Sequence, residues 1–103
     1  MRVIFRYKNH VLRKEQRDFI ESQSQDLNYL AQLDSIKWNI EYSNGEYSLS
    51  AKIFAPKMSL FSRGCGQSLE EAAMNTLDAL EIQMAKFGKI KKGWREQEFK
   101  KTA

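Results

Sequence analysis

The residues in this sequence most able to do chemistry are lysines and arginines that gather near its two ends. Residues 1–17 carry six basic side chains against one glutamate, and residues 86–103 carry seven against two. Two other stretches, 18–35 and 66–85, each contain four acidic residues and no basic one. Because ammonium and guanidinium groups bind phosphates, this pattern indicates a phosphate-rich partner if the fold joins the two ends.

His10 and Cys65 are the only residues of their types and the only candidates for a nucleophilic pair. Such a pair needs both side chains within hydrogen-bond reach, with a third group that orients the base. The two residues lie in different predicted elements, and nothing in the sequence predicts a contact between them. We therefore expect no enzyme activity. A single cysteine also excludes an intramolecular disulfide and a cysteine-based zinc site.

Gly64 and Gly66 flank Cys65 just before a predicted helix, a superficial likeness to a phosphate-binding loop. The segment lacks the spacing and the Lys-Ser/Thr pair of such loops, and Glu70 and Glu71 would repel a phosphate. We expect the glycines to serve a turn that ends the sheet. The other acidic residues suggest no metal site or acid–base pair, so we expect no cofactor, no metal and no small-molecule substrate.

The elements that must position the basic residues follow from two periodicities. Alternating apolar residues predict strands over 1–7, 36–42, 47–53 and 58–63. Apolar residues at helical spacing predict helices over 13–33 and 69–87. The predicted fold class is α+β, in the order β-α-β-β-β-α, similar to double-stranded-RNA-binding domains. A four-stranded, mostly antiparallel sheet would have both helices packed on one face.

Short signals support these boundaries. Asn44-Gly45 suits a type I′ turn between the second and third strands. Ser68 and Glu71 predict a capping box at the start of the second helix. The apolar stripe of the first helix has a gap at Gln23 and Ser24.

The length of 103 residues fits one domain, predicted over 1–92, followed by a basic-aromatic tail over 93–103. Trp94 and Phe99 in that tail could stack on bases or fold back on the core, and burial is favoured because it stabilises large apolar side chains. No stretch approaches the roughly 20 apolar residues of a membrane span. The N-terminus lacks the features of a signal peptide. We therefore expect a cytoplasmic protein without a membrane partner.

The second helix carries the most specific family resemblance. It resembles the second helix of the ribosome hibernation-promoting factors, also called ribosome-associated inhibitors. That helix follows a glycine and an N-cap residue, is rich in leucine and ends in lysines. The similar residues here are Gly64, Gln67-Ser68-Leu69, Ala72, Leu77-Asp78 and Leu80–Lys86. Arg17-Asp18-Phe19-Ile20 resembles the Arg-Glu-Phe-Val of that family's first helix. The resemblance covers about residues 1–92 and is to the short form of the family.

The chain departs from this family on both helices. Gln23, Gln25 and Asp26 stand where the family usually has lysines, and Ala79 and Ile82 occupy positions that are often basic. Glu70 replaces an aromatic residue near the start of the second helix.

The resemblance implies a stress-response translation regulator that is monomeric when free and is not an enzyme. It would bind ribosomal RNA of the small ribosomal subunit and block the mRNA/tRNA path by occupancy, either promoting ribosome dimers or silencing single ribosomes. The predicted RNA-binding residues are Lys86, Lys89, Lys91, Lys92, Arg6, Lys8, Arg13, Lys14, Arg17 and Arg63. These basic residues also have two structural explanations. Lysines at a helix C-terminus complement the helix dipole, and Arg17 could pair with Asp18 or Glu21.

Two other functions compete with this hypothesis. A double-stranded-RNA-binding domain places lysines at the start of its last helix, where this chain has Glu70 and Glu71. The alternative is a protein-interaction module or small assembly subunit. The predicted open sheet face argues against a large apolar docking patch because it is mostly polar. Its residues are Ile4, Lys37, Asn39, Glu41, Ser48, Ser50 and Lys52.

Overall fold

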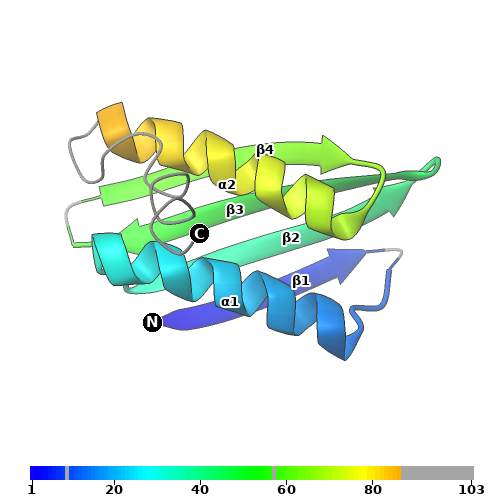
Figure 1. The fold of residues 1–103 in the computed structure, drawn as a ribbon, viewed down its shortest axis with the longest axis horizontal. Coiled ribbons are helices and arrows are strands. Elements are labelled where there is room, and N and C mark those ends of the chain that lie inside the picture. Colours follow the sequence, from blue (N-terminus) through cyan, green and yellow to red (C-terminus); the bar gives the residue numbers. More distant parts are fainter. Residues whose placement is uncertain (9, 57, 87–103) are drawn as a thin grey trace, which may run out of the picture.

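The computed structural model describes residues 1–8, 10–56 and 58–86, except for the side chains of 29–31. The elements are β1 (Arg2–Lys8), α1 (Lys14–Ala31), β2 (Ser35–Ser43), β3 (Glu46–Ala55), β4 (Met58–Gly66) and α2 (Leu69–Lys86) (Figure 1). The predicted β-α-β-β-β-α order is confirmed. The predicted tail over 93–103 lies outside the described residues. No helix in the described ranges is long and apolar enough to cross a membrane.

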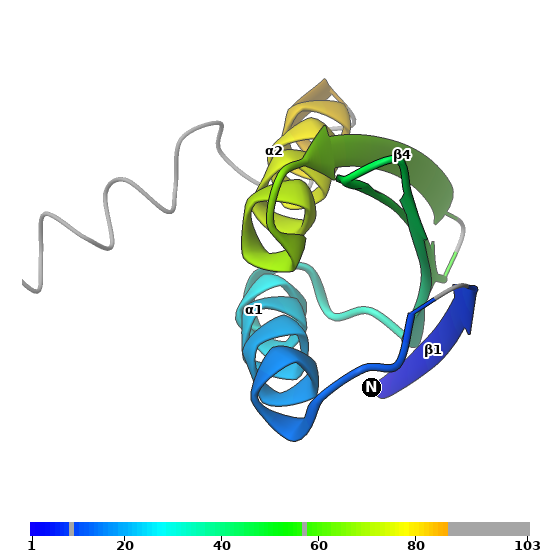
Figure 2. The same cartoon turned by 90° about the vertical axis from the view of Figure 1, so that its right-hand side faces the viewer.

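The four strands form one mixed sheet in the order β1-β2-β3-β4. β1 pairs with β2 in parallel, and the other two pairs are antiparallel. Asn44 and Gly45 both have positive φ in the β2–β3 hairpin, as the predicted type I′ turn requires. Figure 2 shows both helices on the same side of the curved sheet, so none of the described helices covers the opposite face, which we call the open face.

The core lies between the helices and the covered face of the sheet. Its largest side chain, Trp38, is fully buried on β2. Other buried members are Ile20, Leu27, Ile36, Ile40, Leu49, Ile53, Leu69, Leu77, Leu80 and Met84. The residues that alternate with them on the strands therefore face away from the core.

The gap in the apolar stripe of α1 has a structural reason at Ser24. Its buried hydroxyl donates to the carbonyl oxygen of Ile20 at 2.7 Å and accepts the indole N–H of Trp38 at 3.0 Å. A buried N–H without a partner costs free energy, so the serine allows a tryptophan at the centre of the core.

α1 ends two residues earlier than predicted, because Gln32 adopts a left-handed conformation with φ of 53°. The Gln32 N–H donates to the Asn28 carbonyl at 2.8 Å, and the Asn28 side chain accepts the N–H of Leu33 at 2.7 Å. These bonds close the last turn of the helix although no glycine is present.

The prediction that Gly64 and Gly66 form a turn after the sheet is wrong, because β4 continues through both. A Cβ on Gly64 would lie 2.5 Å from the backbone nitrogen of Thr76, and one on Gly66 would lie 2.7 Å from that of Ala72. The glycines therefore let α2 approach the backbone of β4. The predicted cap is present as the Ser68 hydroxyl, which accepts the N–H of Glu71 at 3.1 Å.

Candidate nucleic-acid interface

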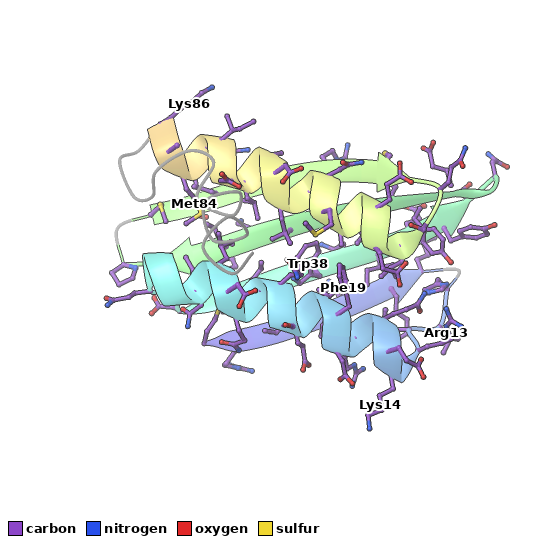
Figure 3. The ribbon with its side chains drawn as sticks, in the orientation of Figure 1. Arg13, Lys14, Phe19, Trp38, Met84 and Lys86 are labelled. Carbon is purple, nitrogen blue, oxygen red and sulfur yellow. The ribbon has the colours of Figure 1, made fainter. Side chains whose placement is uncertain are left out.

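The predicted basic residues at the two ends of the sequence do not meet in the described part of the chain. Lys89, Lys91 and Lys92 lie outside the described residues, and Lys86 is exposed at the last residue of α2. Figure 3 shows Lys86 at one end of the helical layer and Arg13 and Lys14 at the other. Since 18 helical residues rise about 27 Å, the length of a helix separates these groups.

The start of α1, with Arg13 and Lys14, is linked to the sheet by contacts of Gln16, which is buried. The Gln16 side-chain oxygen accepts the Arg13 N–H at 3.1 Å and lies 3.2 Å from Nε2 of His10. The His10 ring meets Tyr47 of β3 edge-on, with centroids 5.1 Å apart. Arg13 and Lys14 are thus exposed at a helix start whose backbone is hydrogen-bonded to the buried Gln16.

Arg17 contacts β1 through an aromatic ring. Its guanidinium carbon lies 5.5 Å from the ring centroid of Phe5, which is half-buried on the covered face. This arrangement combines cation–π attraction with packing of the arginine stem. Contact with RNA at Arg17 would compete with this interaction.

Basic side chains gather on the open face of the sheet. This set, which we call the basic sheet face, consists of Arg2, Arg6, Lys8, Lys37, Lys52 and Arg63. Strand pairing places Lys37 directly opposite Lys52, while Arg6 and Arg63 lie at the two edges of the neighbouring row. Glu41 and Glu46 are the carboxylates that alternation places on this face, and both lie near the β2–β3 hairpin. The face therefore has an excess of positive charge.

The helical layer has the opposite charge. Its described basic residues are Lys14, Arg17 and Lys86. Its acidic residues are Glu15, Asp18, Glu21, Asp26, Glu70, Glu71, Asp78 and Glu81. The helical layer of the described domain is thus negatively charged and the open sheet face positively charged. The charge blocks of the sequence had suggested instead that positive charge lies at the two ends of the chain.

The basic sheet face also exposes aromatic rings. Phe54 is 38% exposed and Phe61 is 47% exposed, and the Lys52 ammonium lies 5.2 Å from the Phe54 ring centroid. Phe54 falls just after the predicted strand over 47–53, and Phe61, in the predicted strand over 58–63, was not assigned to the open face, so both were missed. The face predicted to be mostly polar therefore also carries two exposed phenylalanines that the prediction did not include. The alternation of outward-facing residues could have found them if the predicted strands had been extended to the observed ends of β3 at Ala55 and of β4 at Gly66.

Three tyrosines form a second aromatic group at the hairpin end of the sheet. Tyr42 and Tyr47 have centroids 4.7 Å apart, and Tyr7 is exposed on β1. Alternation predicted these residues on the core side, but they extend beyond the buried positions. Tyr47 also meets the His10 ring in the connection that leads into α1.

His10 and Cys65 contact different partners. His10 lies against Gln16 and Tyr47, whereas the Cys65 thiol lies 3.9 Å from the Ser48 hydroxyl on the open face. Within the described ranges, no three His, Cys, Asp or Glu side chains come together to hold a metal ion.

Two solved structures share this fold, which confirms the predicted resemblance at the level of the fold. A ribosomal subunit interface protein from Coxiella burnetii matches with a TM-score of 0.77 and 11% identity, over 85% of this chain and 98% of that one. The Protein Y N-terminal domain of Thermus thermophilus matches with a TM-score of 0.70 and 18% identity, over 84% and 94%. No family model matches the sequence, and no curated protein matches it significantly.

Proposed function

We propose that this protein is a ribosome-associated translation regulator of the hibernation type. It binds ribosomal RNA of the small subunit and blocks the mRNA/tRNA path by occupancy. The observation that carries the proposal is the match over 85% of the chain to a protein named for the ribosomal subunit interface. A ribosomal partner also implies a cytoplasmic location, and in this proposal the protein is monomeric when free.

Charge supports the proposal independently of the fold. Net charge is +4, and most described cations lie on one surface of the sheet or at the start of α1. Ammonium and guanidinium groups release counterions when they bind phosphates, so affinity for ribosomal RNA should fall steeply with salt. Regulation by occupancy needs no catalytic group, only a domain that competes for the same space.

Co-sedimentation with purified ribosomes and separated subunits tests the proposal, at low and high salt. The variant Lys86/Lys89/Lys91/Lys92→Ala removes four predicted phosphate contacts, and the same four lysines changed to Arg preserve their charge. We expect the wild type and the Arg variant to pellet with the small subunit, and the Ala variant to pellet less. Added mRNA and initiator tRNA should reduce pelleting.

Absence of pelleting with any particle at any salt would overturn the proposed function and leave the fold unchanged. Salt-insensitive recovery of a partner free of nucleic acid would instead favour the protein-interaction module. Pelleting that mRNA and tRNA leave unchanged would keep ribosome association and reject blocking of their path.

A further inference from the structure

We infer that the basic sheet face binds single-stranded RNA, with Phe54 and Phe61 stacking on unpaired bases while the surrounding cations hold phosphates. The inference rests on the proposed function only in taking RNA as the ligand class. It assigns the RNA contact to the open face of the sheet, whereas the family resemblance had pointed first to the end of the second helix.

The register of the sheet brings the two rings together. Phe61 lies directly opposite Lys52, and Phe54 lies directly opposite Ser59, so the two phenylalanines are diagonal neighbours on adjacent strands. Diagonal neighbours on one face have Cα atoms roughly 7–8 Å apart, within reach of aromatic side chains. Lys52 is thus a cation beside both rings.

Basic side chains suited to binding phosphates lie around this aromatic pair. Lys37 lies beside Lys52 in the same row, and Arg63 is the next outward residue after Phe61 on β4. Arg6 lies at the other end of the Arg63 row, across Asn39 and Ser50. Neighbouring strands are about 4.8 Å apart, so a chain of nucleotides crossing the sheet would meet a cation at both edges.

The chemistry of the face favours single-stranded RNA over duplex RNA. Stacking needs the flat face of a base, which a duplex keeps inside its own stack, whereas unpaired bases are free to lie on aromatic rings. The Lys52 ammonium lies over the Phe54 ring and would move to a phosphate when a base takes its place.

Charge also orients the RNA on the molecule. Lys8 is directly opposite Glu41, and Glu46 lies at the adjacent hairpin, so the hairpin end of the face is the least positive. The acidic helical layer on the other side would repel a phosphate backbone. The RNA path therefore runs across the rows that contain Phe54, Phe61, Arg6 and Arg63.

The test measures binding of a fluorescently labelled 12-nucleotide single-stranded RNA to the full chain by anisotropy, at several salt concentrations. A hairpin duplex of the same composition serves as the competing ligand. The charge variant is Arg6/Lys37/Lys52/Arg63→Gln. The variant Lys86/Lys89/Lys91/Lys92→Gln removes the same charge from the predicted phosphate contacts in 86–92, so the comparison shows which set of cations binds the single strand. Phe61→Leu removes one ring, and Ile82→Ala is the control at an exposed apolar residue of α2.

We expect the single strand to bind more tightly than the duplex. If all six cations contact phosphates, the slope of log affinity against log salt has a magnitude of about 4, and the four-residue sheet variant lowers it by about 3. Phe61→Leu should weaken binding roughly 5- to 150-fold with little change in slope, because a stacked base is lost and no charge is. Circular dichroism confirms that each variant is folded.

Equal weakening by the two four-charge variants would overturn the inference, as would unchanged binding by Phe61→Leu or equal affinity for the duplex. Ribosome pelleting separates this failure from failure of the proposed function. If the wild type pellets but the sheet variants keep their affinity for the single-stranded RNA, the sheet inference fails and ribosome association stands. If the wild type does not pellet but the sheet variants lose single-stranded RNA, ribosome association fails and the sheet inference stands.

Discussion

The hydrogen bond between Ser24 and Trp38 provides the sharpest test of how this core is built. Ser24→Ala removes the only acceptor found for the Trp38 indole N–H in the described part of the chain, at 3.0 Å and in a fully buried setting. The second bond of Ser24, to the Ile20 carbonyl, duplicates an acceptor that α1 already uses. The main effect of Ser24→Ala is therefore that the Trp38 indole N–H loses its hydrogen-bond acceptor.

The expected magnitude follows from that geometry. A buried donor left without a partner costs about 1–3 kcal/mol of unfolding free energy. Alanine is a better helix former than serine, by a few tenths of a kcal/mol on most scales, and this partly offsets the loss. Ser22→Ala, at an exposed position of the same helix, reports the helix-propensity effect alone. The difference between the two variants should therefore be about 1–3 kcal/mol.

Urea and thermal unfolding, followed by circular dichroism, measure this difference. For a domain of this size, each 1 kcal/mol lowers Tm by roughly 4–8 °C. The double variant Ser24→Ala/Trp38→Phe removes both partners, so its loss should be smaller than the sum of the two single losses. The reasoning is refuted if Ser24→Ala and Ser22→Ala have the same stability, or if the two single losses simply add.

Two further predictions follow from local contacts. Gly64→Ala should lower stability by about 1–3 kcal/mol in urea unfolding, because its Cβ would collide with α2. Gly45→Asn, at a left-handed position with open space around it, should change stability little, and equal losses at the two sites would contradict the close-packing explanation. Gln16→Ala should speed hydrogen exchange at the Arg13 amide, whose acceptor it removes, and an unchanged exchange rate would show that the α1 start is held in another way.

Local patterns in the sequence predicted the elements well where neighbouring residues decide them. Alternation found the strands, and the Asn44-Gly45 turn and the Ser68 cap are present as expected. The predictions failed where distant residues decide. Gly64 belongs to a strand at a position where any side chain would collide with α2, and the polar Ser24 belongs to the core because Trp38 requires an acceptor.

The sequence by itself determined the order of elements, the predicted fold class and the presence of basic residues suited to phosphates. These follow from periodicity, turn chemistry and composition, which act between near neighbours. Only the tertiary structure showed which other cations share a surface with Lys37 and Lys52. Parallel pairing of β1 with β2 places Arg6 on the same face as Lys52 and Arg63, and the common direction of the helices separates Lys86 from Arg13. Strand register and helix direction are set by packing of the whole core, so alternation placed Lys37 and Lys52 on the open face but could not reveal the complete basic sheet face.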